Sequence, residues 1–152
     1  MRIVLQRVLS GAVTIEGNER RQVAKGFVGL VGFCHGDTEK EADYLASKMV
    51  ELRIFEDENG QMNLSLLETG GECLLVPNFT LYANAKKGRR PSFIEAAHPQ
   101  QAEPIYRHFA GKLKEVGVNR VEMGEFGASM EVTLTNDGPV TIILDSDVIM
   151  PK

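Results

Sequence analysis

The hydrophobic and polar positions of the chain predict a series of short strands interrupted by two helices. Arg2–Leu9 alternates apolar and polar side chains, Ala12–Ile15 continues the alternation, and Gly17-Asn18 supplies a turn before residues 21–24. This order predicts an N-terminal β-hairpin. The next segment, residues 26–33, is apolar and punctuated by glycine, but it lacks the glycine and lysine spacing of a phosphate-binding loop. A buried strand is predicted there.

Two segments repeat apolar residues at the spacing of an α-helix. The first begins near Asp37 or Thr38, either of which has a side chain that can cap it. The second covers residues 99–116 and ends at Gly117. The apolar faces consist of Ala42, Leu45, Met49 and Leu52 in the first helix and of Ala102, Ile105, Phe109 and Leu113 in the second.

A strand-like apolar run over residues 73–76 ends at Pro77, which donates no backbone hydrogen bond. Asn78, Phe79 and Thr80 therefore lie where regular strand pairing stops. Exposed N–H groups at such a break either bind an oxyanion or simply mark a bulged strand end. The Thr80 hydroxyl is a candidate nucleophile, but the sequence shows no Ser-His-Asp-like set of partners for it.

The segment near the C-terminus places turn residues between two apolar runs. Residues 130–134 alternate apolar and polar side chains and residues 140–144 are β-branched and apolar, so both predict strands. Between them, Asn136-Asp137-Gly138-Pro139 predicts a turn, because Asp and Gly tolerate positive φ and Pro fixes its own φ. Two interpretations stay open: a plain hairpin turn, or a rigid backbone edge that faces a ligand.

The composition is that of an ordinary globular protein. The 152 residues, of which 43% are hydrophobic and 25% charged, predict a single domain over residues 1–152. No apolar run approaches the length of a membrane span, and the first residues are too polar for a signal peptide, so a cytoplasmic protein is expected. The net charge of −4 argues against indiscriminate nucleic-acid binding over the whole surface.

One short segment is strongly basic within this acidic chain. Its four cations are Lys86, Lys87, Arg89 and Arg90. Such a cluster suits phosphate, although the same residues would also form a solvated loop. Cys34 and Cys73 lie in or beside apolar runs and are predicted to be buried free thiols. The histidines and cysteines show no metal-ligand spacing, so neither a catalytic metal nor a cofactor is indicated.

Taken together and in this order, these segments resemble the D-aminoacyl-tRNA deacylase family. The resemblance covers nearly the whole chain. It rests on Gln6-Arg7-Val8, Arg53-Ile54-Phe55, Met62-Asn63-Leu64-Ser65, Phe79-Thr80-Leu81, Gly88-Arg89-Arg90-Pro91-Ser92-Phe93, Phe126-Gly127-Ala128 with Met130, and Asn136-Asp137-Gly138-Pro139-Val140-Thr141. Each segment alone is weak evidence, whereas the ordered set in a chain of this length is highly specific.

The resemblance implies an α/β fold in which a barrel-like sheet is flanked by two helices, and a homodimer with active sites at its interface. It also implies hydrolysis of the ester that joins a D-amino acid, or glycine, to the terminal adenosine of tRNA. In the family the Gly-Pro pair is cis and enters the partner's pocket. Carried over, Gly138-Pro139 would offer carbonyl oxygens to the substrate's α-amino group and leave no room for an L side chain.

The resemblance assigns the other site residues as well. Backbone N–H groups near Phe79 and Thr80 would hold the ester carbonyl, and Arg7 would support the Gly-Pro segment. Met130 and Phe126 would line the pocket mouth, with packing in the core as their structural alternative. For Arg7 the alternative is an exposed arginine at a strand end. Aminoacyl-tRNA is the expected partner, and its acceptor stem would be placed by Lys86, Lys87, Arg89 and Arg90.

The chain departs from the family motif Ser-Gln-x-Thr-Leu at two positions. Pro77 replaces the serine, which removes a backbone donor, and Asn78 replaces the glutamine. A related branch with Pro at the first position and a trans Gly-Pro bond prefers mischarged L-alanyl-tRNA. Phe79 and the intact Asn-x-Gly-Pro-x-Thr motif favour the D-specific branch. The two departures also leave open a different class, a dimeric nucleic-acid-binding protein whose ancestral pocket has lost activity.

Two mechanisms fit these residues. In the first, the terminal 2′-hydroxyl of the tRNA, or a water that it orients, takes part in the attack while the protein positions the ester. In the second, Thr80 attacks and forms an acyl-enzyme. The sequence favours the first mechanism, because nothing in it would activate the threonine.

Overall fold

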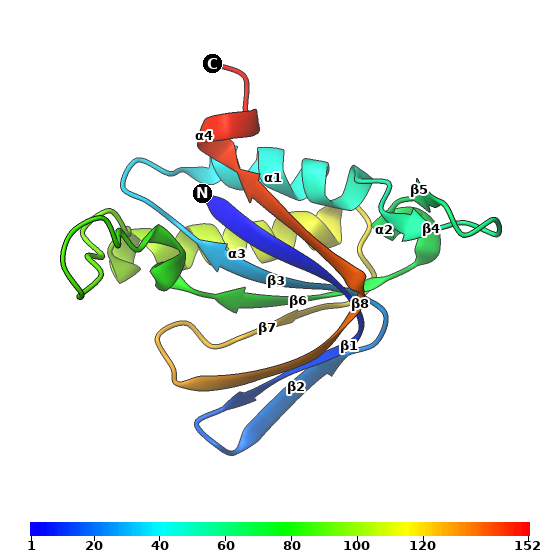
Figure 1. Cartoon of the computed structure of the whole chain (residues 1–152), viewed down its shortest axis with the longest axis horizontal. Helices are drawn as coiled ribbons and strands as arrows, with labels where there is room; N and C mark the ends of the chain where they lie inside the picture. Colours follow the sequence, from blue (N-terminus) through cyan, green and yellow to red (C-terminus); the bar gives the residue numbers. More distant parts are fainter.

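The computed structural model describes residues 1–152 as a strongly curved sheet backed by two long helices (Figure 1). The strands are β1 Arg2–Ile15, β2 Glu19–Val23, β3 Gly26–Gly32, β4 Phe55–Glu56, β5 Met62–Leu64, β6 Glu72–Pro77, β7 Val121–Met123 and β8 Met130–Asp145. The helices are α1 Glu39–Glu51, α2 Leu66–Thr69, α3 Pro99–Glu115 and α4 Ser146–Ile149, with a 3-10 turn, η1, at Phe79–Tyr82. The predicted barrel-like α/β architecture is confirmed, with the short helices α2 and α4 added to the two long ones.

The main sheet has the strand order β2-β1-β3-β6-β7, and β8 pairs with β1. β1 is long enough to pair antiparallel with β2 and β3 on one edge and with β8 along the other. β3 and β6 are parallel, as are β6 and β7. The predicted N-terminal hairpin is confirmed, and the buried strand predicted over residues 26–33 forms as β3, which ends one residue earlier at Gly32.

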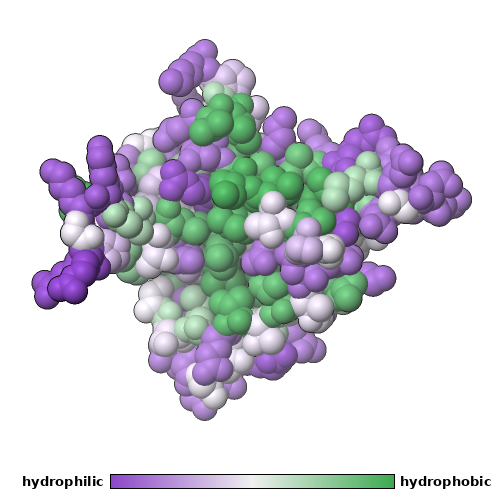
Figure 2. All heavy atoms as spheres, viewed as in Figure 1, coloured by the Kyte–Doolittle hydropathy of each residue, from purple (hydrophilic) through white to green (hydrophobic).

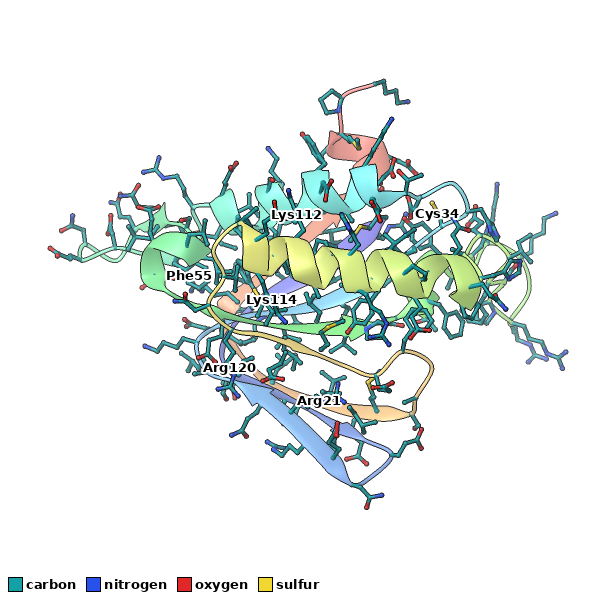
Figure 3. The ribbon with its side chains drawn as sticks, turned by 180° about the vertical axis from the view of Figure 1, so that it is seen from behind. Arg21, Cys34, Phe55, Lys112, Lys114 and Arg120 are labelled. Atoms are coloured by element: carbon teal, nitrogen blue, oxygen red, sulfur yellow. The ribbon has the colours of Figure 1, made fainter.

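Both predicted helices form and lie on the same face of the sheet, as the view from behind shows (Figure 3). Thr38 caps α1 in a capping box, because its side chain and that of Glu41 each bond to the other's backbone N–H. Asp37, the alternative cap, instead accepts a hydrogen bond from the Cys34 N–H at 2.7 Å. α3 begins at Pro99, where the missing N–H of proline costs nothing.

The buried apolar side chains form two clusters. The larger one lies between the helices and the sheet and includes Leu45, Met49, Phe109 and Leu113 from the predicted helix faces. The smaller one lies among the strands: Val8, Val13, Ile15, Val23, Val28, Leu74 and Val76. The second cluster explains why β1 changes partners along its length, since the curved sheet must close around these side chains.

Of the two interpretations of the C-terminal turn, the plain hairpin is wrong. β8 is one strand, and both of its halves pair antiparallel with β1. Thr141 lies opposite Gln6 and Asn136 opposite Val8, so residues 137–140 form an outward bulge across from a single residue, Arg7. Apolar alternation reports which face a side chain takes, but not whether the chain reverses between two runs.

None of the helices is both long enough and apolar enough to cross a membrane.

Candidate active site

The segment after β6 turns the end of a strand into a short helix. Pro77 is the last residue of β6, and the Asn78 N–H still donates to the Val31 carbonyl at 2.8 Å. η1 follows at once, with Asn78 as its N-cap. The Asn78 Oδ1 accepts hydrogen bonds from the Thr80 N–H at 3.2 Å and from the Thr80 hydroxyl. The shorter amide that replaces the family glutamine therefore fixes the backbone of this turn.

These contacts bear on the chemistry of Thr80. Its hydroxyl donates to an amide oxygen, which is not a base able to remove a proton. The first N–H groups of a helix have no acceptor inside that helix. The Thr80 N–H is occupied by Asn78, while the Phe79 N–H has no acceptor among the hydrogen bonds of the chain. The Phe79 N–H is thus a donor available to a substrate oxygen.

Two cavities meet at this turn. One has a volume of about 400 Å³ and the other about 350 Å³, and Pro77, Asn78 and Phe79 line both. The larger cavity is also lined by Phe33, Phe93, Ile94, His98 and Phe126, and the smaller one by Leu30, Val76, Ala128, Met130 and Val132. Phe126 and Met130, the residues predicted at the pocket mouth, thus line different cavities. Phe126 also packs against the larger core cluster.

The bulge in β8 is held in place by hydrogen bonds from Arg7 on β1 and from Asn136 at its own base. Arg7 is only 3% exposed, and its guanidinium donates to the carbonyls of Asp137 at 3.0 Å and Ile54 at 2.7 Å. The Asn136 side chain closes the base of the bulge, since its Oδ1 accepts from the Val140 N–H at 2.8 Å and its amide donates to the Val140 carbonyl at 3.1 Å. Arg7 is buried under the bulge and is not an exposed residue at a strand end.

The tip of the bulge is exposed and does not reach the two cavities of its own chain. Gly138 and Pro139 are both exposed, the peptide bond between them is cis, and neither residue lines either cavity. Gly138 has a φ of 139°, and a Cβ there would lie 2.8 Å from Val140 Cγ2 and 3.4 Å from the Arg7 guanidinium. The chain alone therefore does not bring the Gly-Pro tip together with the Phe79 turn.

The basic segment forms a closed loop at one end of the molecule (Figure 1). Asn84 and Ser92 pair through two backbone hydrogen bonds of 2.8 Å, and Gly88 makes the turn with a φ of 65°. All four cations of the loop are exposed and none lies within 4.0 Å of a carboxylate. Their charge is free to act on an anionic ligand.

Comparison with known proteins decides the family. The sequence profile described as "D-Tyr-tRNA(Tyr) deacylase" matches residues 4–145. The chain belongs to the D-Tyr-tRNA(Tyr) deacylase family. Members of this deacylase family are hydrolases, so the chain that contains the two cavities is an enzyme.

Relatives with curated names agree with this deacylase assignment. The D-aminoacyl-tRNA deacylase of Bacillus velezensis is 55% identical over 146 residues, which cover 96% of this chain and 99% of the relative. That of Thermus aquaticus is 53% identical over 146 residues, covering 96% and 95% of the two chains.

Solved structures agree on the fold. The c-Myc DNA Unwinding Element Binding Protein superposes with a TM-score of 0.89 at 38% identity, over 96% of this chain and 99% of the other. A probable eukaryotic D-amino acid tRNA deacylase superposes with a TM-score of 0.84 at 18% identity, over 94% and 97%. The latter similarity supports the fold alone.

The cysteines of this deacylase have no accessible thiolate. Burial raises the pKa of the Cys73 thiol far above its usual range, and it is the main cause of a raised pKa at Cys34 too. Cys34 is half-buried just beyond β3 (Figure 3). Both thiols stay protonated near neutral pH, so neither suits nucleophilic catalysis. No three His, Cys, Asp or Glu side chains are grouped so that they could hold a metal ion.

Sequence reasoning missed part of this site. It did not single out the side chains of Ile94 and His98 as cavity lining, nor the brace that Asn136 makes across the bulge. A signal for Asn136 existed, because Asn side chains often bond to nearby backbone in turns. Ile94 lies in an irregular segment without apolar periodicity, so the sequence held no comparable signal for it.

Proposed function

We propose that this deacylase hydrolyses the ester of D-aminoacyl-tRNA, and of mischarged glycyl-tRNA, to free tRNA and amino acid. The observation that carries the proposal is the Phe79 turn, which offers an unoccupied N–H donor between two cavities suited to the two halves of an aminoacyl-adenosine. The curated names of relatives at 53% and 55% identity support it. Proofreading of this kind would act on the tRNA pool used in translation, so the proposal includes a cytoplasmic enzyme.

The proposed working unit is a homodimer with two shared sites. The exposed Gly138-Pro139 tip projects from its own chain, and only a second subunit would place it at a Phe79 turn. The face formed by β8 and β1 carries many hydrophobic residues (Figure 2). On β8, Val132 is 40% exposed and Ile143 is 64% exposed, which is a costly arrangement for an isolated chain. Pairing two copies through this face would bury these side chains.

Chiral selection in this proposal uses the backbone of the tip. The carbonyl oxygens of Gly138 and Pro139 would accept hydrogen bonds from the substrate's α-ammonium group. With the amino group held there, an L side chain would point into the tip, whereas a D side chain or the hydrogen of glycine would point away. Arg7 and Asn136 make this selection possible, because they keep the tip from yielding to the wrong enantiomer.

Hydrolysis then needs little from side chains. The Phe79 N–H would donate to the ester carbonyl oxygen and stabilise the negative charge that develops there. A water oriented by the terminal 2′-hydroxyl of the tRNA adds to the carbonyl carbon. The bond to the 3′-oxygen breaks, and that oxygen takes up a proton while the amino acid leaves as its carboxylate.

Replacing Thr80 with alanine separates the two mechanisms. We expect kcat/KM for D-tyrosyl-tRNA to stay within about tenfold of wild type, because the threonine contributes a hydrogen bond to Asn78 and no attack on the ester. Single-turnover deacylation at saturating enzyme measures this. Near-complete loss in Thr80→Ala, with activity retained in Thr80→Ser, would instead establish the acyl-enzyme mechanism.

Reversing charge in the basic loop should weaken binding of the tRNA more than the chemical step. Lys86→Glu combined with Lys87→Glu is expected to raise KM for D-tyrosyl-tRNA by about tenfold at moderate salt, with a smaller change in kcat. The matched control is Lys40→Glu with Lys114→Glu, because both lysines are exposed and lie outside the loop, Lys40 in α1 and Lys114 at the far end of α3 (Figure 3). Equal effects of the two pairs would show that only overall charge matters.

The activity itself is tested by incubating the purified protein with D-tyrosyl-tRNA and following loss of the ester. Turnover of D-tyrosyl-tRNA with L-tyrosyl-tRNA left intact is the expected result. Faster turnover of L-alanyl-tRNA would assign the protein to the L-alanyl-tRNA-editing branch that Pro77 suggests. No turnover at micromolar enzyme, together with salt-sensitive binding of uncharged tRNA, would establish an inactive nucleic-acid-binding protein.

A further inference from the structure

Three exposed apolar side chains surround the opening of the larger cavity. Ile94 is 81% exposed, Phe79 57% and Phe93 37%, and all three line that cavity. The rings of Phe79 and Phe93 meet edge to face, with their centroids 5.1 Å apart. We call these three residues the apolar rim. An apolar group of this size at the surface marks a place that binds another molecule.

The exposure of the rim is built into the fold and does not come from a loose loop. The His35 ring donates from Nε2 to the Ile94 carbonyl at 2.6 Å, and the Ala96 N–H donates to the Phe93 carbonyl at 3.1 Å. Cys34 and Ala96 form an antiparallel bridge just beyond β3. The backbone on both sides of Ile94 is therefore fixed, which keeps its side chain directed away from the core.

The rim continues directly from the basic loop. The Asn84–Ser92 pair closes the loop one residue before Phe93, so the loop that carries the four unpaired cations ends at the rim. Single-stranded nucleic acid is bound by this combination, in which cations follow the phosphates and exposed aromatic side chains such as Phe79 and Phe93 stack on the bases. A protein partner would need acidic groups spaced to match the loop, whereas a nucleic-acid strand carries a phosphate at every residue.

We propose that the rim binds the nucleotide that precedes the terminal adenosine of the tRNA. This inference rests on the proposed function, which places the aminoacylated end of the tRNA at the Phe79 turn. The base of the preceding nucleotide packs on Ile94 and the outer edge of Phe93. Its phosphate faces Lys86 and Lys87. The enzyme thereby recognises the single-stranded end of any tRNA, independently of the amino acid and of the rest of the sequence.

The test compares two substrates that differ only in the polynucleotide. In Ile94→Ser, KM for D-tyrosyl-tRNA is expected to rise about tenfold, the size of a lost base contact. KM for D-tyrosyl-adenosine, which has no preceding nucleotide, is expected to rise by much less, because Ile94 is 81% exposed at the edge of the larger cavity. An equal rise for both substrates would overturn the proposal, because Ile94 would then contact the adenosine alone. No rise for either substrate would overturn it as well.

Two controls keep the test decisive. Met62 on β5 is 55% exposed and lies at the other end of the molecule, so Met62→Ser should change neither KM. A change in the sedimentation of Ile94→Ser would assign Ile94 to the subunit interface and contradict the proposal. The rim is also tested without catalysis, by comparing affinity for uncharged tRNA that lacks only its terminal adenosine with affinity for tRNA trimmed of its last two nucleotides. Wild type should bind the tRNA that keeps the preceding nucleotide more tightly, whereas Ile94→Ser should bind the two equally; absence of turnover would refute only the proposed function.

Discussion

Gly138→Ala is expected to lower kcat/KM for D-aminoacyl-tRNA by about a hundredfold, the scale of effect that a displacement of about 1 Å has on a positioned reaction. The added Cβ would lie 2.8 Å from Val140 Cγ2 and 2.9 Å from the Val140 nitrogen, at a φ of 139° that L residues rarely adopt. The tip must shift to relieve these contacts. Its carbonyl oxygens would then no longer meet the α-ammonium group of the substrate.

The control for this prediction is another glycine with a positive φ but with no close neighbours. Gly60, in the turn between β4 and β5, has a φ of 75°, and a Cβ there would meet nothing within 4 Å. Gly60→Ala should cost some stability but leave kcat/KM near wild type. Steady-state deacylation of D- and L-tyrosyl-tRNA by both variants gives the comparison. Wild-type activity and selectivity in Gly138→Ala would exclude the tip from the site.

Arg7→Ala is expected to affect both stability and activity. Arg7 is nearly fully buried, and its removal leaves the carbonyls of Ile54 and Asp137 without their donor. Each buried acceptor left unsatisfied costs about 1–3 kcal/mol, so the free energy of unfolding should fall by about 3 kcal/mol. The nearby carboxylates of Asp137 and Glu56 are half-exposed and add little to this loss.

Activity should fall in Arg7→Ala beyond what unfolding explains. Under conditions in which urea titration shows the variant fully folded, kcat/KM for D-tyrosyl-tRNA should still drop by about tenfold or more, because the tip is no longer held. Arg20→Ala on β2 is the matched control, since Arg20 is exposed and the one hydrogen bond of its side chain is to Gln22. If Arg7→Ala lost stability and kept full kcat/KM, the arginine would be a purely structural residue.

Local features of the fold were predictable because short stretches of sequence determine them. The two long helices follow from apolar residues at helical spacing. The sequence also contains both residues of the capping box that begins α1, Thr38 and Glu41. The course of β8 was not predictable in the same way. Its two apolar runs predict which side chains point to each face of the sheet. Only the pairing with β1 shows that the chain continues in one direction through both runs.

The residues of the candidate site were predictable from sequence motifs, but their positions relative to one another in space were not. Family resemblance indicated Phe79, Thr80 and the Gly138-Pro139 pair, yet the fold of one chain leaves the tip outside both cavities. The environment of Arg7 depends on Ile54, 47 positions away, which no local pattern reports. The exposure of Ile94 likewise depends on contacts with His35 across the sheet edge.

A mixed dimer tests the central claim most directly, namely that each tip works in the pocket of the partner subunit. One subunit carries Gly138→Ala, and the other carries Ala128→Trp, which fills the smaller cavity. Each variant as a homodimer should keep about 1% of wild-type activity or less. The two are produced together with different affinity tags, and the dimer that carries both tags is purified.

In that mixed dimer one site combines the normal tip of one subunit with the normal cavity of the other. The account therefore predicts about half of the wild-type deacylation of D-tyrosyl-tRNA per dimer, because two-fold symmetry gives two sites and one of them is intact. A mixed dimer as inactive as its parents would show that tip and cavity must belong to the same chain, which would contradict the account.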